Sequence, residues 1–172
     1  MNAVEDSAEV TVRAATGDLQ PVVERLAQLE RHDLSEFRGT GPYADGRFHV
    51  GELPLFFTGP GRAAHLIHHG SRLAGFALTR RLDAATSLSA FFVVRALRRR
   101  RVGHRAALEL LRRQPGPWAI AFQEDNPAAA PFWRKVATAA VGPAWHEERR
   151  PVLGHPELPP DVWLLFDTSG QR

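Results

Sequence analysis

The sequence contains no cysteine, no apolar run long enough to cross a membrane, and no repeat of fixed period. The lack of cysteine excludes disulfides, zinc–thiolate sites and a cysteine nucleophile. The N-terminal residues MNAVEDSAEV lack the apolar core of a signal peptide, so we expect a soluble cytoplasmic protein without membrane contact. The formal net charge is only +3, so the chain as a whole is not expected to bind polyanions.

The sequence does have a cluster of arginines where a predicted strand meets a predicted helix. An apolar run, residues 91–94, precedes Arg98–Arg101, and Gly103 opens a segment whose apolar residues recur at helical spacing. A helix start has several backbone N–H groups without internal partners, and the helix dipole adds positive charge there. This turn is therefore predicted to bind phosphate. The alternatives are a solvated basic turn and a nucleic-acid contact, although no groove-reading motif accompanies the arginines.

The length of 172 residues indicates one domain, with residues 1–9 expected to fray. Hydrophobic periodicity and turn residues predict the elements in order. These are a strand at 10–15, a helix over 19–29 whose inward face includes Leu29, a short helix at 33–37 capped by Asp33, a loop at 38–63, strands at 64–67 and 73–79 around a turn at 68–71, a strand at 87–94, a helix from 102 that ends at 115–117, a strand at 118–122, a helix after Asn126, and strands at 145–152 and 162–166.

Two motifs in this order resemble those of the GCN5-related N-acetyltransferases (GNAT). The first runs from Arg98 to Gly103 and follows the family's pattern of Gln or Arg, two residues, Gly, one residue, then Gly or Ala, except that Arg101 replaces the first glycine. The second comprises four residues at the family's spacing: Asn126, Ala129, Phe132 and Trp133. Because both motifs occur in the right order and separation, the sequence is identified as similar to this family over residues 64–141.

The resemblance implies an α/β (α+β) fold in a single domain, 1–172, with a mixed, mostly antiparallel sheet of about seven strands flanked by about four helices. It implies a cofactor-binding core at residues 88–137 and an acceptor-side wall at 31–57, which includes much of the 38–63 loop. A surface loop with aromatic residues tucked under it is the alternative for that loop. The implied activity is transfer of acetyl from acetyl-CoA, or another acyl-CoA, to an amine by direct attack.

By resemblance, the acyl-CoA diphosphate binds the N–H groups of residues 100–105, and the pantetheine arm runs along a bulged strand. The implied cofactor residues are Phe91, Phe92, Val93, Arg98, Arg99, Arg100, Arg101, Val102, Gly103, His104, Arg105, Asn126, Ala129, Phe132 and Trp133. The strand's backbone N–H, assigned to Val93, would polarise the thioester carbonyl. The implied acceptor-binding residues are Asp33, Glu36 and Phe37.

The sequence departs from the family at both catalytic positions. Trp133 stands where many members have a tyrosine acid, and an indole N–H is no proton-transfer acid at neutral pH. Ser89 and Ala90 stand where many members have a glutamate on the central strand. The candidate bases are therefore Glu124, the pair Asp33 and Glu36, His65, and a chain of water molecules.

The missing glutamate and tyrosine leave a second hypothesis open: a catalytically silent GNAT-fold module that binds or senses acyl-CoA. The expected partner is a small-molecule or peptide amine, without nucleic acid, and a homodimer is an option the sequence does not decide. His65, His68 and His69 are predicted to form a solvated turn rather than a metal site.

Overall fold

The computed structural model describes residues 8–170, and its strands form one sheet in the order β1-β2-β3-β4-β5-β7-β6. The strands are β1 (Val10–Ala14), β2 (Arg62–His69), β3 (Arg72–Arg81), β4 (Thr86–Val93), β5 (Pro117–Phe122), β6 (Trp145–Arg150) and β7 (Asp161–Asp167). All neighbouring strands are antiparallel except β4 and β5. This sheet confirms the predicted fold class.

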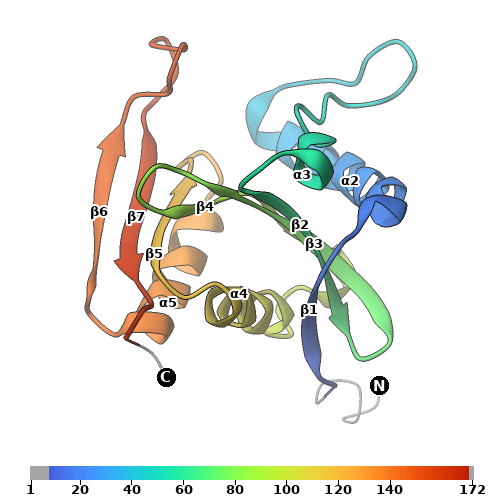
Figure 1. The fold of residues 1–172 in the computed structure, drawn as a ribbon. Coiled ribbons are helices and arrows are strands. Elements are labelled where there is room, and N and C mark those ends of the chain that lie inside the picture. Colours follow the sequence, from blue (N-terminus) through green and yellow to red (C-terminus); the bar gives the residue numbers. More distant parts are fainter. Residues whose placement is uncertain (1–7, 171–172) are drawn as a thin grey trace.

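Helices cover both faces of the sheet (Figure 1). Helices α2 (Gln20–Arg38) and α3 (Leu55–Thr58) lie on one face, and α4 (Val102–Arg113) and α5 (Ala129–Val141) lie on the other. There are also two short 3₁₀ turns: η1 (Gly17–Leu19) leads into α2, and η2 (Arg95–Leu97) follows β4. Among residues 8–170, none of these helices is both long and apolar enough to span a membrane.

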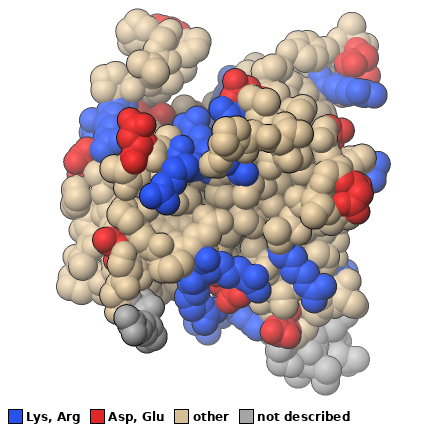
Figure 2. Space-filling model, in the orientation of Figure 1, with Lys and Arg blue, Asp and Glu red and all other residues tan. Residues whose placement is uncertain are grey.

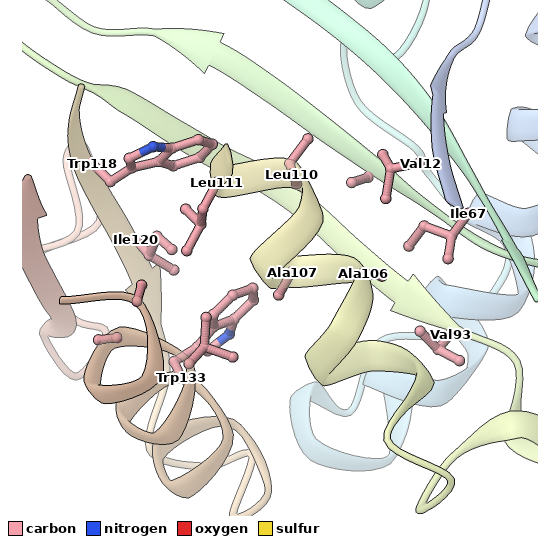
Figure 3. Close-up of a cluster of buried hydrophobic side chains, with 14 of the residues drawn as sticks. Val12, Ile67, Val93, Ala106, Ala107, Leu110, Leu111, Trp118, Ile120 and Trp133 are labelled. Atoms are coloured by element: carbon pink, nitrogen blue, oxygen red, sulfur yellow. The ribbon is translucent and has the colours of Figure 1, made fainter. Parts of the chain in front are cut away.

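Each face of the sheet has its own buried core. Figure 3 shows the core under α4, where alanines and leucines of that helix face Trp118 and Ile120 of β5 and Val12 of β1. The α2 side has a second cluster, which includes Phe76 and Phe92 of neighbouring strands. Because side chains alternate along a strand, β4 contributes to both cores at once.

Strand β4 contains a bulge at Ser89. Leu78 of β3 is opposite Ala90, whereas the next residue, Thr79, is opposite Leu88, so Ser89 has no partner residue on β3. A bulge inserts one unpaired residue and bends the strand. The bulge that the family resemblance implies is thus present in β4.

The parallel strands β4 and β5 pair only at their start. Thr86 pairs with Trp118 and Ser87 with Ala119, and no further pair joins the two strands. Beyond this point β5 pairs only with β7, along its whole length. The sheet is therefore split between β4 and β5, and side chains rather than backbone bonds line the opening.

Three details of the sequence prediction were wrong. Residues 20–38 form one helix, because no glycine or proline interrupts them after Pro21, so Asp33 lies inside α2 and caps nothing. The inward stripe of α2 is Val23, Leu26, Ala27 and Glu30, and Leu29 is exposed. Strand β2 continues to His69 through a bulge after Ile67, so the turn is limited to residues 70–71.

The extended β2 also contradicts the predicted solvated histidine turn, because His65 and His69 are buried. No group of three metal-ligating side chains occurs within residues 8–170. Of the segment expected to fray, residues 1–7 lie outside the described residues.

Candidate active site

A cavity of about 150 Å³ occupies the split between β4 and β5. Its lining combines apolar side chains of both strands with the inner side of α2 and the start of α5. The lining residues are Glu30, Leu34, Phe37, Arg38, Leu88, Ser89, Ala90, Phe91, Ile120, Ala121, Phe122, Gln123, Asp125, Asn126, Ala129 and Trp133. Segments far apart in the sequence therefore meet at one opening in the sheet.

Three aromatic rings connect this cavity to the start of α4. The Phe91 ring centroid lies 5.9 Å from that of Phe132 and 5.3 Å from that of Trp133, and the latter two rings are 4.8 Å apart. A Cβ placed on Gly103 would lie 3.5 Å from the Phe132 ring and 3.6 Å from Val93. These are ordinary van der Waals distances, so packing within the protein does not itself demand glycine at this position.

The arginine turn, Arg98–Arg101, brings backbone N–H groups together at the start of α4. Arg99 and Arg101 both have left-handed backbone angles, with φ of 62° and 61°, which are uncommon for residues other than glycine. Arg101 directly precedes the helix and occupies the motif position where the family has glycine. The left-handed backbone that a glycine would favour is thus kept despite the side chain.

The predicted diphosphate site, the N–H groups of residues 100–105, is one residue shorter in the structure and stops at His104. The N–H of Arg105 donates to the Arg101 carbonyl at 2.9 Å, so this N–H is already used within the helix. The Arg105 side chain lines a second cavity, of about 620 Å³, on the outer side of α4. Burial lowers the pKa of His104, with the charges of Lys135 and Arg101 acting in the same direction, so its imidazole is neutral at pH 7.

Arg98 ties the arginine turn to both β4 and α2. Its Nε donates to the Val93 carbonyl at 2.7 Å, and its guanidinium lies 5.4 Å from the centroid of the Phe92 ring. The guanidinium also pairs with Asp33, to which Arg95 donates at 2.9 Å from its Nε. Arg98 is therefore a structural bridge, whereas Arg99, Arg100 and Arg101 form no ion pair with any residue between 8 and 170.

The predicted acceptor residue Asp33 is engaged by these two arginines. Burial would raise the pKa of Asp33, but the hydrogen bonds from Arg95 and Arg98 outweigh it and hold the pKa below its usual range. Such a carboxylate is a poor base. Glu36 is exposed, whereas Phe37 lines the cavity. Within residues 31–57, only Leu34, Phe37 and Arg38 line the cavity, and none of residues 39–57 does.

The backbone of Val93 faces the split rather than β3. Paired residues of an antiparallel ladder alternate between hydrogen-bonded and non-hydrogen-bonded positions. The N–H of Val94 donates to the Ala74 carbonyl at 2.9 Å, so Val93, opposite Gly75, is at a non-hydrogen-bonded position. Its N–H consequently points away from β3, toward the side from which β5 has diverged. Phe91 lines the cavity, whereas Phe92 is buried in the core under α2.

Asn126 organises the loop that leads into α5. Its Oδ1 accepts the N–H of Ala128 at 3.2 Å and its carbonyl accepts the N–H of Ala129 at 3.1 Å. The helix begins at Ala129, so Asn126 precedes it by three residues, in agreement with the sequence prediction. Asn126 and Ala129 both line the cavity.

The other candidate bases lie outside the cavity. Glu124 is exposed and accepts two hydrogen bonds from Arg149, at 2.7 and 2.9 Å, which lower its pKa. His65 is buried on the α4 side, where its Nε2 lies 3.1 Å from Thr79 Oγ1 and 3.4 Å from Gln114 Nε2. Burial lowers the pKa of His65 to about 4, so the ring is neutral at pH 7.

Two acidic residues line the cavity, the buried Glu30 and the exposed Asp125, and the sequence prediction missed both. Glu30 lies on the same helical stripe as Val23, Leu26 and Ala27, and only 9% of the surface of Glu30 is exposed to solvent. The spacing 23, 26, 27, 30 was visible in the sequence, and a carboxylate on an apolar stripe is a signal because charged groups are rarely buried without a partner. Reading residues 33–37 as a separate helix obscured this continuity.

Basic side chains gather over α4 on the face shown in Figure 2, with acidic groups among them. Glu109 of this helix accepts hydrogen bonds from Arg112 at 2.9 Å and from Arg113 at 2.8 Å. These exposed pairs neutralise part of the basic charge at the helix end.

Neither a family model nor a curated protein sequence matches this chain. Solved structures do match. A probable GNAT-family acetyltransferase from Chromobacterium violaceum is 17% identical, with a TM-score of 0.65 over 96% of this chain and 86% of its own. A ribosomal-protein α-N-acetyltransferase in complex with coenzyme A is 12% identical, with a TM-score of 0.66 over 95% of this chain and 96% of its own.

The protein has the GNAT fold. A third GNAT-like structure, the spermidine N-acetyltransferase from Vibrio cholerae in complex with CoA and spermine, is 12% identical, with a TM-score of 0.59 over 91% of this chain and 94% of its own. Each alignment spans nearly the whole of both chains, so the likeness covers the entire GNAT architecture rather than one shared motif.

Proposed function

We propose that this protein is an N-acetyltransferase that transfers an acetyl group from acetyl-CoA, or another acyl-CoA, to an amine. The observation that carries the proposal is the split between β4 and β5, which opens beside the start of α4. A parallel pair that separates after two residue pairs leaves strand backbone unpaired, and unpaired backbone in a protein interior requires a partner. An extended ligand with amide groups, such as a pantetheine arm, supplies that partner.

The donor supplies an activated thioester carbonyl, and the protein's own groups hold and polarise it. The N–H groups of Val102, Gly103 and His104 hold the diphosphate, with the charges of Arg100 and Arg101 beside them. Packing within the protein does not require a glycine at Gly103. A bound diphosphate would account for the glycine, because a side chain at this position would obstruct the approach of the ligand to the backbone.

The peptide N–H of Val93 donates to the thioester oxygen and to the negative charge that develops on it. Loss of such a donor typically costs about 3–4 kcal/mol of transition-state stabilisation. Asn126 and Ala129 border the cavity, while Phe132 and Trp133 wall the passage to α4 and exclude water. The acceptor approaches from the α2 side, past Phe37. Cytoplasmic location stays a prediction, and a homodimer stays an option that the sequence does not decide.

Thermal unfolding with and without millimolar CoA tests donor binding. A ligand at 100 times its Kd adds about 2.7 kcal/mol of stability, which raises the Tm of a domain of this size by roughly 5–10 °C. The double variant Arg100→Glu/Arg101→Glu should lose most of the rise, whereas reversing two arginines far from the turn, Arg25 and Arg81, should leave it intact. A wild-type Tm that CoA does not change would contradict the proposal.

Thiol release from acetyl-CoA then tests turnover, with spermidine, kanamycin and an alanyl peptide as acceptors. An active enzyme releases thiol with at least one of these amines. CoA binding without release would instead favour the silent acyl-CoA-binding module, which the replacement of the usual glutamate and tyrosine by Ser89, Ala90 and Trp133 also supports.

A further inference from the structure

Glu30 is a buried carboxylate that accepts no hydrogen bond from the described residues, and its ion-pair partner there is the adjacent Arg31. Its Oε2 lies 3.7 Å from the Nε of Arg31, a distance too long for a hydrogen bond. The Arg31 Nε is itself buried without a hydrogen-bond partner among the described residues. Burial of an ionised carboxylate without donors is costly unless a ligand supplies them. The position of Glu30 on the cavity wall therefore indicates a cationic ligand.

The charged groups around Glu30 leave this carboxylate as the inner negative group of the cavity. On α2 itself these groups are Arg31, Arg38, which also lines the cavity, and Asp33, which is already paired with Arg95 and Arg98. Asp125, which is exposed, lines the cavity from the segment before α5, and β4 and α5 contribute only uncharged side chains to the lining. Burial raises the pKa of Glu30, and Arg31 and Arg38 only partly offset this, so Glu30 is a stronger base than an exposed glutamate.

Apolar side chains form part of the remaining cavity lining, to which Arg38, Ser89, Gln123, Asp125 and Asn126 add polar groups. Leu34 precedes the cavity mouth on α2, and Leu88, Phe91 and Ile120 face in from the two separated strands. A ligand that reaches Glu30 therefore has a charged head and a short hydrocarbon stem. This combination describes a primary alkylammonium group.

We propose that Glu30 binds the acceptor's ammonium group and takes one proton from it, so that the acceptor is a primary amine on a short apolar stem. The N–H bond breaks, the proton joins a Glu30 carboxylate oxygen, and the bonding electron pair stays on nitrogen as the lone pair that attacks. Glu30 returns to its ionised form by releasing this proton to water. The proposal rests on the acetyltransferase function inferred above, and it gives the site a base in place of the missing strand glutamate.

The experiment measures binding of n-butylammonium to the full chain saturated with CoA, by NMR titration, with n-butanol as the uncharged probe of the same shape. Wild-type protein should bind butylammonium at least tenfold more tightly than butanol. Glu30→Gln should abolish this preference. Glu24→Gln, which removes a carboxylate six residues earlier on the same helix and outside the cavity, should keep it. The wild-type affinity should fall as the pH is lowered through the pKa of Glu30, and Glu30→Gln should lose that dependence.

Equal binding of the two probes to the wild type, or unchanged charge preference in Glu30→Gln, would overturn the proposal. Should Glu30→Gln not fold, Glu30→Asp and the wild-type pH dependence decide, because the shorter carboxylate should retain the preference with weaker binding. The CoA-induced rise in Tm should be the same in both glutamine variants. If CoA produced no rise in any protein while the butylammonium preference still required Glu30, the acetyltransferase proposal would fail and the cation site would stand.

Discussion

The arginine turn and the cavity between β4 and β5 are built in opposite ways. The turn is one continuous stretch with left-handed angles at Arg99 and Arg101, and its proposed phosphate site consists of backbone N–H groups. The cavity takes its lining from α2, β4, β5 and α5, and its proposed chemistry comes from side chains such as Glu30. A backbone-built site leaves a compact motif in the sequence, whereas a site built from side chains requires knowledge of which elements meet.

Strand β4 precedes the arginine turn and lines the cavity, so a substitution that displaces β4 should disrupt both regions. A Cβ on Gly75 would lie 1.9 Å from the Phe92 carbonyl oxygen and 3.1 Å from the Val93 Cα, which no rotamer change can relieve. We expect Gly75→Ala to lower the free energy of unfolding by about 3 kcal/mol, measured by urea denaturation. Gly41→Ala, where a Cβ meets nothing within 4 Å, is the control and should change little. Equal stabilities would show that β3 and β4 are not this close.

Asp33 joins the two regions, because it lies on α2 and pairs with Arg98 of the turn and with Arg95 of the preceding η2. We expect Asp33→Asn to lose about 1.5 kcal/mol of stability at pH 7, the usual contribution of a hydrogen bond to a charged group. The folded pKa of Asp33 is depressed, so this contribution is complete above about pH 4, the usual range for an aspartate, and disappears as pH falls through the folded pKa. Urea denaturation at pH 7 and at pH 3 measures both values.

The matched control for this change is Asp83→Asn, in an exposed turn. It should leave stability within about 0.5 kcal/mol of the wild type. A difference between Asp33→Asn and wild type that stayed constant from pH 7 to pH 3 would show that the ion pairs do not produce the effect.

The smallest predicted effect concerns the turn alone. A left-handed residue other than glycine costs roughly 1–2 kcal/mol, while glycine costs roughly 0.5–1 kcal/mol through its greater freedom in the unfolded chain. Arg101→Gly should therefore stabilise the protein by about 0.5 kcal/mol in urea denaturation. Arg100→Gly, at a neighbour whose φ is not positive, should destabilise it instead. The same sign in both variants would contradict the backbone argument.

Much of the fold could be predicted because its signals are local. Alternation in residues 10–15, the apolar run before the arginines, and the proline and glycine residues at 115–117 gave strands and helix ends close to those observed. The errors arose where local and tertiary signals compete. Asp33 resembles a helix cap by residue type, yet its side chain pairs with arginines more than 60 positions away. A bulge after Ile67 lets β2 continue where His68 and His69 suggested a turn.

The residues of the candidate site also fall into two groups: those found from local motifs and those that depend on tertiary packing. The motif at residues 98–103 and the second motif at 126–133 located the residues around α4 and α5 without any structure. Glu124 was expected on the strand after the α4 segment, but it lies beyond the end of β5. Its pairing with Arg149 of β6 depends on the β5-β7-β6 order, which no local pattern reveals. Only the packing of α2 across the split brings Glu30 to the cavity.

The central claim is that the backbone N–H groups at the start of α4 bind the diphosphate of the donor. Titration of ¹⁵N-labelled protein with CoA tests it most directly, because the amide signals of Val102, Gly103 and His104 report on those groups individually. The account predicts that these three signals show the largest shifts and that 3′-dephospho-CoA, which keeps the diphosphate, shifts them equally. Saturation by CoA with these three signals unmoved, or with shifts confined to the other side of α4, would contradict it.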